Sequence, residues 1–310
     1  MKRKIVLCGA HEVGIDIIEY LSEKNIEISH IISLTNLQAK KFNVSGYVSY
    51  KKIAKKFNIP IYYPKDYSLK HKSDQNFFEK NKFDLLLLGG WQRLIPQSIL
   101  STLKFGGLGL HGSAEFLPKG RGRSPINWSL IQNKKKFIMH LFSLSSGVDD
   151  GKIITYKTFD INKWDTCRTL YYKNSIVSKK MLASHIPKIF NGKIRTKSQK
   201  GKPTYLPKRT PEDGIINWKK SSEEIFNLVR AVTKPYPGAF TFTKTQKIIV
   251  WNAFPFDNSI KYSDFKNGQV VEKFFTGDLV IKCGKGTLLI TNYEGSVNKN
   301  EILGNGKKNQ

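Results

Sequence analysis

A strand and a helix follow one another in residues 4–21, KIVLCGAHEVGIDIIEYL. The run Lys4–Cys8 is short and apolar, which is typical of a strand that is buried on both faces. Apolar side chains then recur at helical spacing over Val13–Leu21. Because a strand that leads into a helix is the repeating unit of α/β architecture, this stretch predicts a sheet covered by helices.

The same alternation continues through the first ninety residues. Ile26–Ser33 has strand character, Lys51–Phe57 favours a short helix and Ile59–Tyr63 favours another strand. Asp84–Leu88 is apolar after its aspartate and ends at a pair of glycines. Continuous apolar strands that alternate with helices predict an α/β fold with a doubly wound, mostly parallel sheet.

Ligands of a doubly wound sheet bind beyond the carboxyl ends of its strands. The segments that follow predicted strands are Gly9–Val13, Gly89–Ile95 and Leu110–Pro118. The first of them has too few glycines for the dinucleotide fingerprint, so the sequence does not support NAD binding.

The last third of the chain has a different pattern. Beyond residue 190 the hydrophobic periodicity stops, and a helix then follows over Ser221–Thr233 with Ser222 as the expected N-cap. Short alternating segments separated by turn residues come next, which predicts a small β-barrel. We therefore predict a first domain over residues 1–190, a linker over 191–208, a C-terminal OB-like β-barrel domain over 209–300 and a frayed tail over 301–310.

The chain is strongly basic, with a formal net charge of +28. Only eight of the 52 basic residues are arginine, although sites that bind phosphate or carboxylate in fork geometry favour arginine. Two interpretations stay open: compositional drift toward lysine, or a surface that binds a polyanion such as tRNA.

No apolar run approaches the ~18 residues that a membrane span needs, and the apolar stretch after Met1 is too short for a signal peptide. A cytoplasmic protein without a membrane partner is therefore expected. Its cysteines, Cys8, Cys167 and Cys283, are scattered without CxxC spacing, so we expect reduced thiols and no metal site.

The most informative motif lies in residues 109–128, GLHGSAEFLPKGRGRSPINW. His111 follows an apolar strand, and a glycine-rich loop then leads to Pro125 at the start of a helix. Further on, Asp149 lies in an acidic loop, SGVDDGKII, at residues 146–154. A histidine and an aspartate on neighbouring strand ends can form a charge-coupled pair that moves a proton near neutral pH.

With these motifs the chain resembles the formyltetrahydrofolate-dependent formyltransferase family over about residues 4–255. Three further stretches carry the resemblance, GWQRLI at residues 90–95, RTPEDGIINW at 209–218 and NLVRAVTKPYPGAF at 227–240. The matched positions of the catalytic motifs are His111, Ser113, Leu117, Pro118, Gly122, Pro125, Asp149, Asp150 and Gly151.

The resemblance implies a Rossmann-like catalytic domain over residues 1–190 and 10-formyltetrahydrofolate as the formyl donor, without a metal. It implies direct attack by an amine and a tetrahedral intermediate, with His111 and Asp149 as the catalytic residues. It also implies that folate contacts Gln92, Arg93, Leu94, Ile95 and Val148, and that substrate contacts Ser113. Arg121 and Arg123 are candidates to bind a phosphate of the substrate, and a solvated loop is the alternative for both.

One position departs from the family pattern. The family has a catalytic asparagine two residues before the histidine, and this chain has Gly109 there. We expect another donor to replace the missing amide, either Asn127, Gln92 or a main-chain amide of the longer loop that follows Ser113.

The expected acceptor depends on which branch of the family the chain resembles, the tRNA-acting branch or the branch that modifies nucleotide-linked sugars. Residues 34–47, LTNLQAKKFNVSGY, contain two lysines but lack the basic Arg-Gly-Lys-Lys insertion of the tRNA-acting branch. We therefore expect a nucleotide-linked amino sugar as the acceptor, with initiator methionyl-tRNA as the alternative. A folate- or nucleotide-sugar-binding homologue without turnover is the second alternative, and a homodimer is compatible with any of them.

Overall fold

The computed structural model describes residues 3–304. The chain divides into two compact units. The first contains Met1–Gly122, Phe137–Phe159 and Tyr171–Tyr205, and the second contains Arg123–Lys136, Asp160–Leu170 and Leu206–Gln310.

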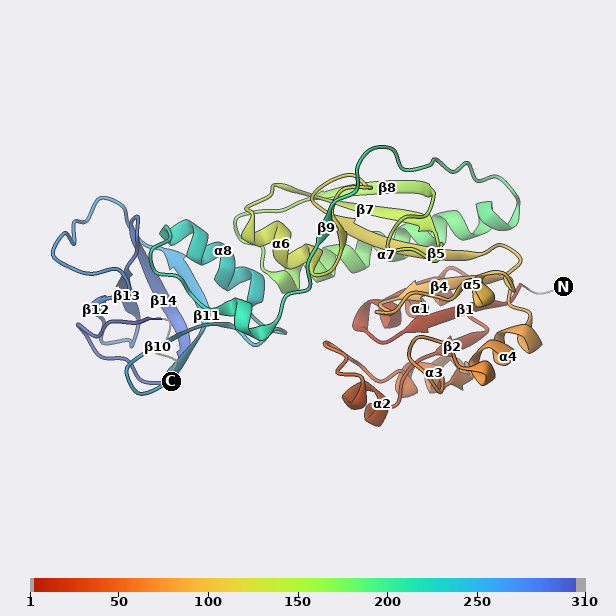
Figure 1. The fold of residues 1–310 in the computed structure, drawn as a ribbon, viewed down its shortest axis with the longest axis horizontal. Helices are drawn as coiled ribbons and strands as arrows, with labels where there is room; N and C mark the ends of the chain where they lie inside the picture. Colours follow the sequence, from red (N-terminus) through yellow and green to blue (C-terminus); the bar gives the residue numbers. More distant parts are fainter. Residues whose placement is uncertain (1–2, 305–310) are drawn as a thin grey trace. The chain divides into compact units, whose positions relative to one another are not determined.

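The first unit is built on a seven-stranded sheet with the order β3-β2-β1-β4-β5-β7-β8 (Figure 1). Its strands are β1 (Ile5–Gly9), β2 (His30–Ile32), β3 (Ile61–Tyr62), β4 (Leu85–Gly89), β5 (Gly107–Ser113), β7 (Lys136–Ser143) and β8 (Ile153–Asp160). The pairs from β3 to β5 are parallel, whereas β7 is antiparallel to β5. The predicted α/β fold with a doubly wound, mostly parallel sheet is confirmed.

Helices lie between the parallel strands, as the alternating pattern requires, and one long helix follows β8. They are α1 (Glu12–Glu23), α2 (Asn36–Lys41), α3 (Lys51–Phe57), α4 (Lys72–Asn81), α5 (Gln97–Leu100) and α7 (Cys167–Phe190). The central strands are buried on both faces, and β1 is fully buried over its five residues. Strand order reverses between β1 and β4, so the loops after these two strands open at the point where such sheets bind ligands.

The second unit contains a five-stranded antiparallel sheet with the order β10-β11-β14-β13-β12. Its elements are α6 (Pro125–Ile131), the 3-10 turn η1 (Pro211–Gly214), α8 (Ser222–Val232), β10 (Ala239–Phe242), β11 (Lys247–Pro255), β12 (Val270–Lys273), β13 (Leu279–Lys282) and β14 (Thr287–Glu294). The N-cap of α8 is Ser221 and not Ser222, because the Ser221 hydroxyl accepts from Glu224 N at 3.2 Å.

The end of the described chain connects the two edges of this sheet. Gly304 bridges to Phe242 on β10, and Ile302 bridges to Gln269 beside β12. The antiparallel sheet is thereby closed on itself through residues 302–304. These residues begin the tail predicted to fray, and residues 305–310 of that tail lie outside the described residues.

Arg230 holds residues 160–170, which lie within the predicted first domain, in the second unit. This buried side chain on α8 donates from Nη1 to the carbonyl oxygens of Asn162 and Asp165, both at 3.0 Å, and from Nε to Asn227 Oδ1 at 2.9 Å. Burial lowers the pKa of Arg230, and the nearby Asp165 opposes that shift. Residues 160–170 therefore pack with the C-terminal part of the chain, although they precede it by forty residues.

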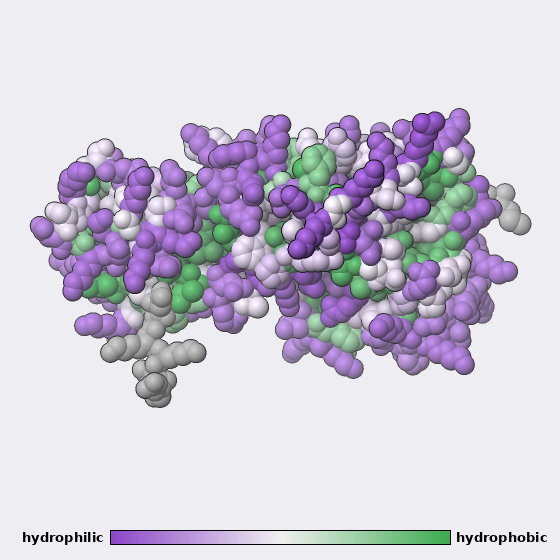
Figure 2. All heavy atoms as spheres, turned by 45° about the horizontal axis from the view of Figure 1, so that its top comes forward, coloured by the Kyte–Doolittle hydropathy of each residue, from purple (hydrophilic) through white to green (hydrophobic). Residues whose placement is uncertain are grey.

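The visible surface of both units is mostly hydrophilic (Figure 2). Among the helices of residues 3–304, none combines the length and apolar character that crossing a bilayer requires. The three cysteines are free and buried, and burial raises the pKa of the Cys167 thiol to about 12.

Candidate active site

Strand β5 brings His111 next to Asp149, as the sequence predicted. His111 Nδ1 lies 3.4 Å from Asp149 Oδ2, and the side chains are only 7% and 21% exposed. Because β7 is antiparallel, its end at Ser143 pairs with Leu108 near the start of β5. The loop of residues 144–151 must therefore run back along β5 to deliver Asp149 to the histidine.

Both ring nitrogens of His111 face hydrogen-bond acceptors. Nδ1 faces the Asp149 carboxylate, and Nε2 lies 2.7 Å from the carbonyl oxygen of Gly120. Only the doubly protonated ring offers a hydrogen to both acceptors at once. The arrangement suits a histidine that acts as a cationic hydrogen-bond donor.

Asp149 is held by the loop opposite. Its Oδ2 accepts from Gly122 N at 3.0 Å, while its backbone has a φ of +48°. Aspartate and asparagine tolerate this left-handed conformation better than most residues do. The Gly120–Gly122 segment thus contacts both members of the pair, through the Gly120 carbonyl and the Gly122 amide.

A side chain at position 120 would disturb the segment that contacts His111 and Asp149. The φ of Gly120 is +71°, and a Cβ there would lie 2.6 Å from Ser113 Oγ. Ser113, predicted to contact substrate, donates its hydroxyl to Glu115 O at 2.6 Å and accepts from Glu115 N at 3.2 Å. The structure therefore places Ser113 in the turn that shapes the loop.

Residues 197–205, which we call the strap, are hydrogen-bonded to the Gly120–Gly122 segment of this loop. Lys197 bridges to Ile153, and Thr204 accepts from Gly120 N through Oγ1 at 2.9 Å and from Arg121 N through its carbonyl at 3.0 Å. The strands β6 (Arg121–Gly122) and β9 (Tyr205–Leu206) form a two-stranded sheet here. The strap lies in the predicted linker over residues 191–208, because its polar residues carry no periodic signal.

The two arginines predicted to contact substrate lie in different surroundings. Arg121 is buried, and it donates to Gln199 Oε1 from Nη2 at 2.6 Å and from Nε at 3.2 Å. Its Nη1 donates to Tyr205 Oη at 3.3 Å. Arg123 is exposed and belongs to the second unit. A substrate contact stays a prediction for both, although the guanidinium of Arg121 is bonded within the fold.

His140 lies opposite His111 in the β5–β7 pair and is buried. Burial, reinforced by the nearby His111, lowers the pKa of His140 to about 4. Its Nε2 accepts from Leu117 N at 3.4 Å, and its Nδ1 has no partner within the described residues. His140 is therefore a neutral core residue behind the pair.

The predicted folate-contacting loop follows β4. Gln92 donates its main-chain N–H to Tyr67 Oη at 3.0 Å, and the Arg93 guanidinium lies 4.7 Å from the centre of the Tyr67 ring. Ile95 is buried, whereas Leu94 is 49% exposed. Val148, in the loop that carries Asp149, is 39% exposed. The structure leaves two of the predicted contacts, Leu94 and Val148, as accessible apolar side chains.

The place of the missing asparagine is filled by aromatic and aliphatic side chains. A Cβ at Gly109 would lie 2.5 Å from Phe142 Cζ and 2.8 Å from Leu144 Cδ2. Phe142 is the cross-strand partner of Gly109 on β7, so its ring lies over the glycine.

Gly109→Asn alone is therefore expected to lower stability by ~1–3 kcal/mol, as overpacking does, and not to raise the rate of formyl transfer. Gly109→Asn combined with Phe142→Ala should regain rate relative to either single variant, because the ring no longer occupies the site. Thermal unfolding and kcat measured on the three variants test this. A single Gly109→Asn enzyme that is as stable as the wild type and faster would contradict it.

Two of the side chains expected to replace that asparagine are engaged elsewhere. Asn127 Nδ2 donates to Ala231 O at 2.7 Å within the second unit. Gln92 Nε2 lies 2.6 Å from His11 Nε2 and donates to Ser45 O at 3.2 Å. The main-chain amides of the loop after Ser113 are the remaining candidate from the sequence.

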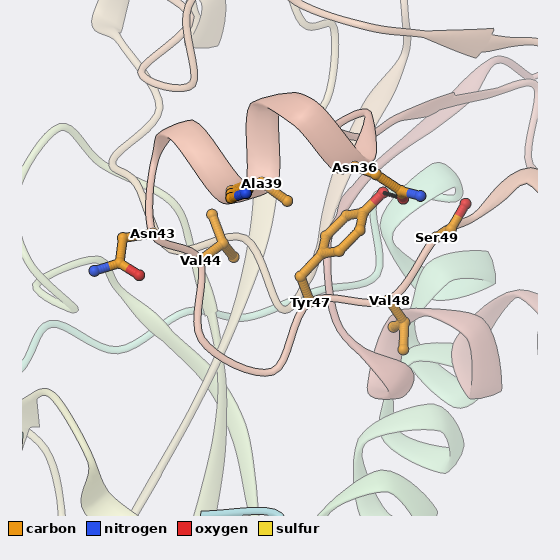
Figure 3. A pocket seen from close by; sticks show the side chains of 8 residues that line it. Asn36, Ala39, Asn43, Val44, Tyr47, Val48 and Ser49 are labelled. Carbon is orange, nitrogen blue, oxygen red and sulfur yellow. Dashed lines mark hydrogen bonds between the residues drawn. The ribbon is translucent and has the colours of Figure 1, made fainter. Parts of the chain in front are cut away.

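A separate pocket of about 580 Å³ lies beside α2 (Figure 3). Tyr47 forms one wall, with its hydroxyl donating to Leu34 O at 2.7 Å. The lining residues, none of which was predicted as a site residue, are Asn36, Ala39, Lys40, Asn43, Val44, Tyr47, Val48 and Ser49. Within residues 3–304, no cluster of three or more His, Cys, Asp or Glu side chains could hold a metal ion.

A curated relative matches most of the chain. Bifunctional polymyxin resistance protein ArnA of Wigglesworthia glossinidia brevipalpis is 31% identical over 288 residues, which are 93% of this chain and 42% of that protein. The chain therefore spans less than half the length of this relative.

Solved structures share the fold. An N-formyltransferase from Helicobacter canadensis, in complex with folinic acid and dTDP-3-aminofucose, matches with a TM-score of 0.66 and 20% identity over 94% of this chain and all of its own. A methionyl-tRNA formyltransferase from Clostridium thermocellum matches with a TM-score of 0.55 and 18% identity over 84% of this chain and 96% of its own. At these identities the likeness shows the fold alone.

Two family models match the chain, one in its N-terminal part and one in its C-terminal part. The model of the formyl transferase C-terminal domain matches residues 208–300, and the formyl transferase model matches residues 2–186. The second match covers more than half of the 310 residues, and the chain therefore belongs to the formyl transferase family.

Proposed function

We propose that this protein transfers a formyl group from 10-formyltetrahydrofolate to the amino group of a nucleotide-linked sugar. The observation that carries the proposal is the buried His111–Asp149 pair, 3.4 Å apart, in a chain of the formyl transferase family. In the reaction the amine nitrogen bonds to the formyl carbon, the bond from that carbon to the folate nitrogen breaks, and a proton passes from the amine to that nitrogen.

His111 is the residue that we propose to stabilise the tetrahedral intermediate. Attack by the amine places negative charge on the formyl oxygen, which would replace the Gly120 carbonyl as the acceptor of the Nε2 hydrogen. A hydrogen bond from a cation to an oxyanion is about twice as strong as one between neutral groups. The exchange therefore favours the transition state over the ground state.

Asp149 orients the ring and helps to move the proton. Its carboxylate faces Nδ1, which leaves Nε2 directed at the Gly120 carbonyl, the position that we assign to the formyl oxygen. We propose that the same carboxylate helps to move the proton from the attacking amine toward the departing folate nitrogen.

The loop after β4 and the loop that carries Asp149 contain the residues that we propose to bind the folate donor. Leu94 and Val148 offer exposed apolar surface to a flat ring system. Since the Gln92 amide is bonded to protein atoms, the polar contacts would come from the main chain of residues 93–95.

The relatives and the sequence together favour a sugar as the acceptor. The Helicobacter canadensis enzyme was solved with an amino sugar linked to a nucleotide, and this chain lacks the basic insertion after β2. The net charge of +28 favours the alternative, initiator methionyl-tRNA, because tRNA is a polyanion.

The dependence of catalytic efficiency on salt separates the two acceptors. A tRNA held through six or more phosphates should lose orders of magnitude in efficiency between ~50 and ~200 mM salt, whereas a nucleotide sugar should respond weakly. We expect formylation of a nucleotide-linked 4-amino sugar with a shallow salt dependence. The measurement is release of tetrahydrofolate with a panel of nucleotide amino sugars and with charged initiator tRNA.

The panel has two outcomes against the proposal. Efficient, steeply salt-dependent formylation of the tRNA without formylation of any sugar would identify the tRNA as the acceptor. Binding of the folate without release of tetrahydrofolate, for every acceptor, would indicate a binding homologue without turnover, as the absent asparagine at position 109 would allow.

A further inference from the structure

The side chain of Gln199 on the strap uses both ends of its amide. Nε2 donates to two main-chain carbonyl oxygens, Asp149 O at 2.7 Å and Gly151 O at 2.9 Å. Oε1 accepts from two nitrogens of Arg121, at 2.6 and 3.2 Å. One neutral side chain thus joins two segments that are far apart in the sequence.

On its first side Gln199 fixes the backbone that carries the catalytic carboxylate. An aspartate side chain is short, so the place of its oxygens follows the place of its own backbone. The two carbonyls bonded to Nε2 belong to Asp149 itself and to Gly151, and they hold a residue whose φ is +48°. Such a left-handed conformation persists only where its surroundings determine it.

On its other side Gln199 holds the segment that contacts the histidine. Arg121 lies between Gly120, whose carbonyl faces His111 Nε2, and Gly122, whose amide donates to Asp149. The guanidinium is buried, and most of its bonds to protein go to Gln199. Displacing Gln199 would therefore loosen both contacts of the pair, although Thr204 still holds the amides of Gly120 and Arg121.

We propose that Gln199 is a positioning residue, which sets the placement of Asp149 relative to His111 without touching substrate. For its kinetic readout the proposal rests on the function proposed above. A misplacement of about 1 Å in a catalytic constellation can cost ~10² in rate. Gln199→Leu should therefore lower kcat by about 10- to 10²-fold while KM for the folate stays within twofold.

The Gln199→Glu variant separates the two halves of the contact. A glutamate keeps the acceptor for Arg121 but turns a carboxylate oxygen toward the carbonyls of Asp149 and Gly151. We expect Gln199→Glu to lose kcat as Gln199→Leu does, although its charge pairs with the arginine. A glutamate variant with the wild-type kcat would overturn the proposal, because the Asp149 loop would then not need the amide.

The control is Lys200→Leu, which introduces the same side chain at the exposed neighbour. It should leave kcat and the melting temperature unchanged. A parallel fall of kcat, folate affinity and melting temperature in both Gln199 variants would indicate general loss of structure, and it would also overturn the proposal.

Amide hydrogen exchange of the free enzyme supplies a readout that does not need turnover. The peptide over residues 120–123 should exchange about tenfold faster in Gln199→Leu, because its Gly122 amide donates to the Asp149 carboxylate that Gln199 positions, and at the wild-type rate in Lys200→Leu. Faster exchange in a protein that transfers no formyl group would refute the proposed function and keep the positioning role. Unchanged exchange in an active enzyme would refute the positioning role alone.

Discussion

Asp149→Asn is expected to lower kcat for formyl transfer by about 10²-fold or more, while the folate still binds. The substitution keeps the shape of the side chain and an oxygen for the Gly122 amide, but it removes the charge that faces His111 Nδ1. Asparagine also tolerates the φ of +48°, so the loop should persist. His111→Asn should have an effect of similar size, because the shorter, neutral amide does not place a donor where Nε2 lies.

Asp150→Asn is the matched control for this result. Asp150 is the exposed neighbour of Asp149, and its carboxylate accepts a hydrogen bond from the Ser145 hydroxyl. The Asp150→Asn variant should therefore have nearly the wild-type kcat. The measurements are kcat, KM and the folate dissociation constant for each variant. Near wild-type rates from both Asp149→Asn and His111→Asn would remove these residues from the catalytic role.

Gly151→Ala should be among the most damaging single changes of the loop that carries Asp149. A Cβ at this position would lie 1.7 Å from the carbonyl oxygen of Ser143, which is backbone and cannot rotate away. We expect a loss of stability above the ~1–3 kcal/mol of ordinary overpacking. Since the Gly151 carbonyl also accepts from Gln199, kcat should fall together with stability.

Gly147→Ala in the same loop tests whether the cause is the backbone contact. A Cβ at Gly147 would lie 1.9 Å from Asp150 Oδ2, which is the end of an exposed side chain and can turn aside. Its loss of stability should be much smaller than that of Gly151→Ala. Denaturant unfolding of both variants measures the difference, and equal losses would show that the Ser143 contact is not decisive.

Much of the sheet could be predicted because its strands are continuous apolar runs. The expected helix at Lys51–Phe57 coincides with α3, and the expected strand at Asp84–Leu88 differs from β4 by one residue at each end. The expected strand over Ile26–Ser33 was too long, since β2 contains only His30–Ile32. Strand length depends on what the neighbours offer for pairing, and a single sequence does not carry that information.

The long helix α7 was not predicted, because its sequence lacks a clear helical periodicity. Tyr172 and Ile176 on this helix are exposed while Leu170 and Met181 are buried, so its apolar residues do not form one clean stripe. Pro187 near its end would also suggest that no helix continues there.

The site divides in the same way. The proximity of His111 and Asp149 could be predicted because each lies in a motif with a recognisable order of residues. Gln199 could not, because the residues around it are polar and aperiodic, and its partners lie 48 to 78 positions earlier in the chain. The hydrogen bonds that hold this pair come from tertiary structure, and local patterns do not encode them.

The ring of Phe142 over Gly109 also constrains the order in which substitutions can accumulate. With Phe142 in place, an asparagine at position 109 meets the ring at 2.5 Å, so regaining the amide in one step costs stability at once. Reversal becomes accessible only after position 142 has first become smaller, a change that opens a cavity and brings no benefit by itself. Gly109 and Phe142 together therefore make the loss of the asparagine hard to reverse. Related proteins that contain both residues would be expected to improve other oxyanion donors instead of restoring the asparagine.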